Sequence, residues 1–300
     1  MKSLSRGFLL LILEIITFQL NIPSALSINS IRNLRDPSTE TDKDGRNEKR
    51  PLIYTFFEIG DDVTLQEHAK LLATWAELWS EAGWEPRVLT LEDAKKHPNY
   101  EKFSKEIIYP GPLHYLSFDY MCLMRWLAMA VQGTGGWMSD YDVIPMGINV
   151  SDGHFLPNFG AFTNYDGTVP SLMSGTAEEW ERMSQHVLGI AAQSSHFFFS
   201  DMLAMQQLHE QSPLGYMTMH QIYDGLPYVQ RNLINCDSLK GVIAAHLSRS
   251  RIQQAVTNGL VTIPDETEKN ESVVAQVRSS VAKELSIHWK QQCFSKIAMD

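Results

Sequence analysis

Two aspartates separated by one residue, Asp140 and Asp142, are the side chains of this sequence whose spacing best suits metal chemistry. They follow an apolar segment and a glycine pair in the run 135–145, which reads GGWMSDYDVIP. Carboxylates at positions i and i+2 of a strand point to one face and can converge on one cation. Mn²⁺ and Mg²⁺ prefer oxygen ligands and are often held by carboxylates together with substrate phosphates. The run therefore predicts an Mn²⁺ or Mg²⁺ site beside a diphosphate, with a solvated turn as the competing interpretation.

The segments that lead to this pair alternate between strand and helix patterns. Short apolar or β-branched runs predict strands, and apolar residues at helical spacing predict helices. The order strand, helix, strand indicates a parallel sheet covered by helices, in which ligands bind beyond the carboxyl ends of the strands. The predicted elements are strands at 52–57, 87–91 and 137–143 and helices at 65–79 and 118–131, with a glycine at position 83 closing the first helix.

The second half of the chain continues with shorter elements. We predict strands at 159–163, 169–173 and 242–245, and helices at 177–190, from 200 or 201 onward, and at 271–292. The fold class expected from this order is α/β, a single domain with a mixed, mostly parallel sheet flanked by helices. We expect the domain to span residues 51–263, with residues 264–300 forming a C-terminal helical segment packed on it.

The N-terminus has the pattern of a targeting segment. Lys2 and Arg6 precede an apolar run that ends near Leu20, and small residues suited to cleavage follow, which predicts a signal peptide at 1–27. A membrane anchor is the alternative, although Glu14 is costly in a spanning helix. Residues 28–50 are polar and charged and predict a flexible linker or stem. Either interpretation places the chain in the secretory pathway, in the lumen of the endoplasmic reticulum or Golgi, or secreted.

Sequons and cysteines agree with that route. Asn149 and Asn270 each begin an Asn-x-Ser sequon. The three cysteines permit one disulfide, and their wide spacing does not suit a metal site. Cys122 lies in an apolar helical pattern, which favours a buried thiol and leaves Cys236 and Cys293 as the preferred pair.

The charge of the chain limits its partners. Lysine and arginine number 25 against 35 acidic residues, which gives a net charge of −10. A balance this acidic argues against general binding to nucleic acid or to anionic membranes, and it leaves room for a local basic pocket that binds a phosphate. Contact with a membrane is expected only if the N-terminal segment is an uncleaved anchor.

The segment from Arg125 to Pro145 resembles the sugar-binding region of GT-A-fold glycosyltransferases with a DXD motif. The likeness is greatest to glycosyltransferase family 32 and its α-mannosyltransferase-like relatives, in which an arginine on a helix precedes a Gly-Gly turn, three residues, Asp-x-Asp and a hydrophobic residue. Those places are taken here by Arg125, 135–136, Asp140, Asp142 and Val143. The resemblance implies a GT-A (Rossmann-like) fold, donor contacts from Arg125, Gly136 and Asp140, and metal ligation by the two aspartates. It also implies transfer with retention of anomeric configuration.

Three further residues have two interpretations each. Arg125 could reach the donor diphosphate or form an ion pair with Asp140 or Asp119, because a guanidinium in an apolar helix needs a partner. His246 resembles the late histidine that adds a metal ligand in many GT-A enzymes, and a partly buried core histidine is the alternative. Asp201 resembles the acidic residue near the reacting sugar carbon, and a helix N-cap is the alternative.

The function predicted is a metal-dependent glycosyltransferase that moves a sugar from a UDP- or GDP-sugar to a glycan or glycoprotein. The family usually has Ser-Asp where this chain has residues 121–122, Met-Cys, and this departure leaves other functions open. One is a secreted, non-catalytic protein that binds glycans or nucleotide sugars on the same fold. Another is a phosphodiesterase or nucleotidyltransferase that uses the same aspartates.

Overall fold

The computed structural model describes residues 49–58, 65–107, 118–194, 199–224, 235–259, 261 and 271–294. The predicted signal peptide or anchor at 1–27, nearly all of the predicted linker at 28–50, and Asn270 of the second sequon lie outside these residues. Among the helices described, none is both long and apolar enough to span a bilayer.

A six-stranded sheet forms the centre of the fold, in the order β2-β1-β3-β6-β5-β7. β1 runs parallel to β2 and β3, β5 runs parallel to β7, and β6 runs antiparallel to β3 and β5. One strand thus opposes the common direction, so the predicted mixed, mostly parallel sheet is confirmed. The strands are β1 (Leu52–Phe56), β2 (Glu85–Leu89), β3 (Gly136–Ser139), β5 (Thr163–Asn164), β6 (Leu172–Gly175) and β7 (Met217–Thr218).

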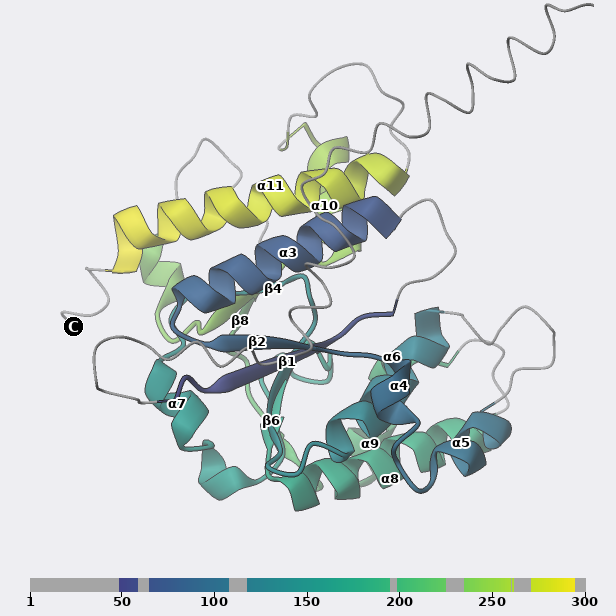
Figure 1. Cartoon of the computed structure of the whole chain (residues 1–300). Coiled ribbons are helices and arrows are strands. Elements are labelled where there is room, and N and C mark those ends of the chain that lie inside the picture. The colour runs from purple at the N-terminus through teal and green to yellow at the C-terminus, as the bar shows by residue number, and fades with distance from the viewer. Residues whose placement is uncertain are drawn as a thin grey trace, which may run out of the picture.

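Helices cover both faces of this sheet (Figure 1). On one face lie α3 (Leu65–Glu81) and α11 (Glu271–Trp289), and on the other lie α4 (Leu91–Ala94), α5 (Tyr100–Glu106), α6 (Phe118–Ala130), α8 (Ala177–Gln193) and α9 (Asp201–Gln211). Leu72, Trp75 and Trp79 recur three and four residues apart along α3 and are fully buried. Burial of each such side chain contributes about 1.5–3 kcal/mol, which anchors α3 to the sheet.

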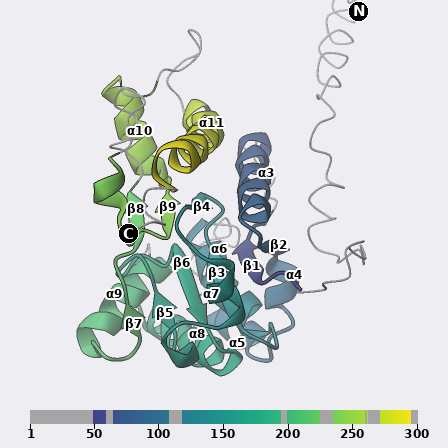
Figure 2. The ribbon, with the colours of Figure 1, turned by 90° about the vertical axis from the view of Figure 1, so that its left-hand side faces the viewer.

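A second, three-stranded sheet has the order β4-β9-β8. It contains β4 (Val143–Pro145), β8 (Ile222–Asp224) and β9 (Ala244–His246), with β4 antiparallel and β8 parallel to β9. Figure 2 shows these strands between the main sheet and α10 (Arg249–Thr257) and α11. Smaller elements are α7 (Val150–His154), the 3₁₀ turns Asn158–Gly160 and Cys236–Leu239, and a π-helical turn, Lys290–Phe294.

Three strand predictions need correction. The strand predicted at 137–143 is divided into β3 and β4, because the chain turns at Asp140 and leaves the main sheet for the second one. The strands predicted at 159–163 and 169–173 lie later, as β5 and β6. Residues 158–160 form a 3₁₀ turn in which Asn158 and Phe159 both have positive φ, a conformation that a strand pattern of apolar residues does not indicate.

The C-terminal helix α11 packs along α3 (Figure 1). The hydroxyls of Thr74 and Ser279 lie 2.7 Å apart in the buried contact between the two helices. A disulfide joins Cys236 to Cys293, just beyond the end of α11, and Cys122 is free. The preferred cysteine pair is therefore confirmed, and α11 is held to the body of the domain by both packing and a covalent bond.

Candidate metal centre and active-site cavity

The turn that carries the two aspartates is fixed from α3. The indole of Trp75 donates to Oγ of Ser139 at 2.9 Å, and the indole of Trp79 donates to the carbonyl of Val143 at 3.0 Å. Within the turn, the amide of Val143 donates to the carbonyl of Asp140 at 3.0 Å. Both ends of the turn are therefore anchored to one rigid helix, which holds the intervening carboxylates in place.

A cavity of about 690 Å³ opens over this turn. Its wall combines the turn with the N-terminal half of α6, the first residues of α9 and α10, His68 of α3 and one residue of α11. Such a volume suits a small-molecule ligand, for which pockets of roughly 300–1,000 Å³ are usual. Its charged and histidine residues are His68, Asp119, Arg125, Asp140, Asp142, Asp201, His246, Arg249 and Arg278.

Asp140, Asp142 and His246 form one compact group in this cavity. Each offers a ligand atom within 4.8 Å of the others. Asp140 and His246 are partly exposed, and Asp142 is nearly buried, with 9% of its surface exposed. β4 pairs with β9 so that Val143 lies opposite His246, which brings the neighbouring Asp142 to the imidazole. Nε2 of His246 lies 3.7 Å from Oδ1 of Asp142. The structure thus brings together the three residues that the sequence suggested as metal ligands.

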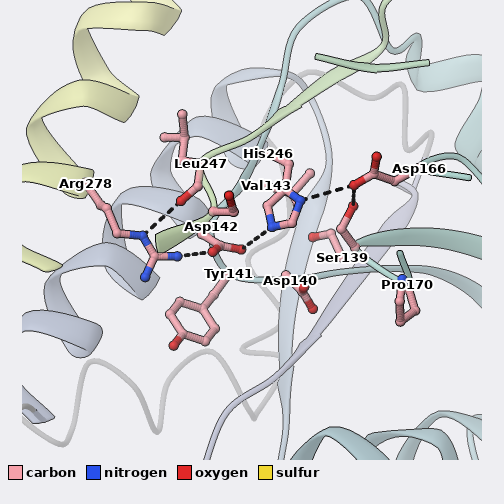
Figure 3. A network of polar contacts seen from close by, with 12 residues as sticks. Ser139, Asp140, Tyr141, Asp142, Val143, Asp166, Pro170, His246, Leu247 and Arg278 are labelled. Carbon is pink, nitrogen blue, oxygen red and sulfur yellow. Dashed lines mark hydrogen bonds and ion pairs between the residues drawn. The ribbon is translucent and has the colours of Figure 1, made fainter. Parts of the chain in front are cut away.

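The other ring nitrogen of His246 has a carboxylate partner. Nδ1 lies 3.1 Å from Oδ2 of Asp166 (Figure 3). A 2.8 Å hydrogen bond from Ser171 fixes the orientation of that carboxylate. A proton on Nδ1 that is donated to Asp166 leaves the lone pair of Nε2 on the side of Asp142. This is the arrangement that orients histidine ligands in metal sites.

The group fits a cation by its chemistry. Two carboxylates and an imidazole provide the oxygen and nitrogen donors that suit Mn²⁺, and the carboxylates alone suit Mg²⁺. Each aspartate gives one oxygen to an arginine, since Oδ1 of Asp140 accepts from Arg125 and Oδ2 of Asp142 accepts from Arg278. The second oxygen of each carboxylate is left for a cation. Two carboxylates close together repel each other, and a bound cation would relieve that repulsion.

Arg125 lies at the base of the cavity and is almost fully buried. Besides its contact with Asp140, its Nε donates to Oδ2 of Asp201 at 2.8 Å and its second terminal nitrogen donates to the carbonyl of Pro170 at 2.9 Å. Burial lowers the pKa of Arg125, and the charges of Asp140 and Asp201 outweigh this and raise it. Of its two interpretations, the ion pair with Asp140 is the one observed.

Asp201 is the first residue of α9, and the N-cap role belongs to Ser200, whose hydroxyl accepts from the amide of Leu203. The side chain of Asp201 is buried against the cavity and also accepts a 3.0 Å hydrogen bond from the indole of Trp126. Burial raises the pKa of this carboxyl, and the charge of Arg125 opposes the rise. The N-cap interpretation of Asp201 is therefore corrected, and the residue joins the charged network of the cavity.

The glycine pair at 135–136 has a structural role in the backbone conformation before β3. Gly136 begins β3, at the opposite end of the strand from the aspartates, and is not among the residues that line the cavity, so the donor contact inferred for it has no support in the geometry. Gly135 has φ +65°, and a Cβ there would lie 2.5 Å from backbone atoms of residues 175–177. The pair is therefore explained by a tight turn and a close backbone approach.

Two residues that sequence reasoning missed complete the site. Asp166 holds His246, and Arg278 of α11 contacts Asp142 (Figure 3). Position 278 lies four residues after Val274 and three before Val281, so the arginine side chain falls within the apolar stripe of its helix. That anomaly is the same signal that drew attention to Arg125. Asp166 gave no comparable signal, because its loop has no periodic pattern.

A family model described as a domain of unknown function (DUF8765) matches residues 45–294. Since this range covers most of the chain, the protein belongs to that family. A comparison with curated proteins finds no match.

Among solved structures, the chain is similar to the crystal structure of the apo-form glycosyltransferase GlyE of Streptococcus pneumoniae TIGR4. The identity is 12%, the TM-score is 0.43, and the match covers 79% of this chain and 63% of that chain. The chain thus spans less than two thirds of the length of GlyE. None of the three comparisons confirms the resemblance to glycosyltransferase family 32.

Proposed function

We propose that this protein is a metal-dependent glycosyltransferase of GT-A type, related to family 32. It would transfer a sugar from a UDP- or GDP-sugar to a glycan or glycoprotein with retention of configuration. The observation that carries the proposal is the convergence of Asp140, Asp142 and His246 in a ligand-sized cavity that also contains arginine side chains. The order of residues from Arg125 to Val143, which resembles the sugar-binding region of that family, supports it as well.

Asp140, Asp142 and His246 would hold Mn²⁺ or Mg²⁺. When bound, the cation would neutralise charge that develops on the departing nucleoside diphosphate. Arg249 in the first turn of α10 and Arg278 of α11 also line the cavity and bring positive charge to it, and cationic donors of this kind suit phosphate oxygens. These features support a diphosphate next to the metal group.

Arg125 positions the acidic residues of the site. Its guanidinium joins Asp140 on one side to Asp201 on the other, so one buried cation sets the spacing of both carboxylates. Asp201 faces the cavity, and a carboxylate there can stabilise the positive charge of an oxocarbenium-like transition state or accept a proton from an acceptor hydroxyl. We assign it this role in the proposed reaction.

The test is a donor-hydrolysis screen with UDP- and GDP-sugars and Mn²⁺. Asparagine variants of the metal aspartates are better than alanine variants, because an amide oxygen can still accept from Arg125 or Arg278. We expect release of nucleoside diphosphate from one donor by the native protein and by Glu101→Gln, an exposed carboxylate control, and loss of release in Asp140→Asn and Asp142→Asn.

The products separate this function from its alternatives. Release of a nucleoside monophosphate would indicate a phosphodiesterase. Metal-dependent donor binding without release, in the presence of a panel of glycan acceptors, would indicate a non-catalytic binding protein. Either result would refute the transferase proposal.

We also propose that the protein acts in the secretory pathway. The Cys236–Cys293 disulfide supports this, since such bonds persist in oxidising compartments. Asn149, the N-cap residue of α7, is exposed and offers its sequon to glycosylation. Expression in eukaryotic cells should give a glycan-dependent mass that falls in Asn149→Gln. A thiol-reduced, unglycosylated cytosolic protein would contradict the proposal.

A further inference from the structure

Arg278 connects the two chain segments that carry metal ligands. The amide of Leu247, the residue after His246, donates to the backbone carbonyl of Asp142 at 2.9 Å. Nε of Arg278 donates to the carbonyl of Leu247 at 3.0 Å, and a terminal nitrogen of the same guanidinium donates to Oδ2 of Asp142. These three contacts close a ring that ties the β3–β4 turn to the end of β9, and Figure 3 shows the two that Arg278 makes.

We propose that Arg278 is a positioning residue for the metal site. By occupying Oδ2 of Asp142 it leaves Oδ1, the oxygen nearest to Nε2 of His246, as the atom that faces a cation. By bonding Leu247 it also fixes the segment that carries His246. The C-terminal helix α11 is then part of the active site. This inference rests on the metal centre of the proposed function.

Because Arg278 is charged, the direction of the change in metal affinity on its substitution tests the inference. A buried guanidinium next to a bound cation repels it, so simple electrostatics predicts tighter metal binding when the charge is removed. A positioning role predicts the reverse, because the loss of fixed geometry outweighs the relief of repulsion. Residues that orient metal ligands typically contribute about 10–100-fold to metal affinity.

The experiment measures Mn²⁺ affinity by the electron paramagnetic resonance signal of free Mn²⁺ in three variants. Arg278→Gln removes both the charge and the planar guanidinium with its several donors. Arg278→Lys keeps the charge but cannot bond Asp142 and Leu247 with the same geometry. Lys283→Gln is the matched control, since Lys283 lies on the same helix and pairs at the surface with Glu77. Circular dichroism establishes that each variant is folded.

We expect both Arg278 variants to bind Mn²⁺ about 10–100-fold more weakly than the native protein, and Lys283→Gln to bind it equally well. Unchanged or tighter binding in folded Arg278→Gln or Arg278→Lys would overturn the inference. Tighter binding would indicate that the guanidinium of Arg278 occupies the place of the metal ion and is displaced when the metal binds. Failure of the native protein to bind Mn²⁺ would instead refute the metal centre itself.

A measurement on the native protein decides the question if neither Arg278 variant folds. The Nε–H of Arg278 should be protected from hydrogen exchange in ¹⁵N spectra, because it is bonded to the Leu247 carbonyl. A positioning role predicts that this protection persists or increases when Mg²⁺ is added. Loss of protection on addition of Mg²⁺ would show that the cation displaces the arginine and would overturn the inference.

Discussion

Nδ1 of His246 lies 3.1 Å from Oδ2 of Asp166, although 80 positions separate the two residues in the chain. The contact orients the imidazole so that Nε2 is directed to the side of Asp142. Carboxylate partners of this kind fix the tautomer and the ring orientation of histidine ligands in metal sites. The ring of His246 therefore already has the orientation that a metal ligand needs before a cation binds.

Asp166→Asn should weaken Mn²⁺ binding by about 10–100-fold, because an amide is a poorer partner than a carboxylate for the Nδ1 proton. Titration calorimetry measures the affinity directly. Ser171→Ala, which removes only the 2.8 Å hydrogen bond to Asp166, should have a smaller effect. Equal affinities in Asp166→Asn and the native protein would show that the His246–Asp166 contact has no bearing on the metal.

Arg125→Met should destabilise the fold strongly. It leaves the buried carboxylate of Asp201 and the neighbouring Asp140 without their shared cation, and breaking a buried pair from one side costs about 3–5 kcal/mol. The free energy of unfolding in urea is the measurement. Arg182→Met removes a half-exposed partner of Glu179 and should cost about 0–1 kcal/mol. Similar losses in both variants would contradict the network described for Arg125.

The sequence predicted the candidate metal ligands better than the residues that surround them. Asp140 and Asp142 belong to a local motif, and His246 follows a short apolar run, so each leaves a signal within a few residues. Asp166 and Arg278 reach the site only through strand pairing and helix packing across 80 and 136 positions. The break between β3 and β4 was missed for the same reason, since membership of a second sheet depends on β9.

Two glycine substitutions should change stability in opposite directions. Gly135→Ala places a Cβ 2.5 Å from backbone atoms at a φ of +65° and should cost more than about 1 kcal/mol. Gly189→Ala lies within α8, where a Cβ meets nothing within 4 Å, and should stabilise by about 0.5–1 kcal/mol. Thermal unfolding of both variants measures the difference. A stabilised Gly135→Ala would contradict the tight turn before β3.

The free energy of unfolding should fall in alkaline solution, because tyrosines that are buried in the folded protein ionise at lower pH in the unfolded chain. Burial raises the pKa of Tyr165 to about 12, although the hydroxyl of Ser174 partly opposes the rise. Because the folded-state pKa is the higher one, the contribution of Tyr165 is complete below about pH 10, the pKa expected in the unfolded chain, and is lost as the pH approaches 12. Two pKa units correspond to about 2–3 kcal/mol.

Urea unfolding between pH 9 and pH 11.5 measures this dependence. Tyr165→Phe removes one ionising hydroxyl, so its stability should fall less steeply with pH than that of the native protein. Tyr216, whose pKa burial also raises to about 12, should account for part of the remaining slope. Identical slopes in the native protein and Tyr165→Phe would contradict this assignment.

We propose that Asp140, Asp142 and His246 form one metal site that binds a nucleotide-sugar donor. The most direct test is calorimetric titration of the native protein and Asp142→Asn with Mn²⁺, followed by titration with UDP- and GDP-sugars at saturating Mn²⁺. We predict that the native protein binds Mn²⁺ and then one class of donor, and that Asp142→Asn loses both while remaining folded. Donor binding that is equally strong without Mn²⁺, or unchanged in Asp142→Asn, would rule out a metal site at these residues that binds the donor.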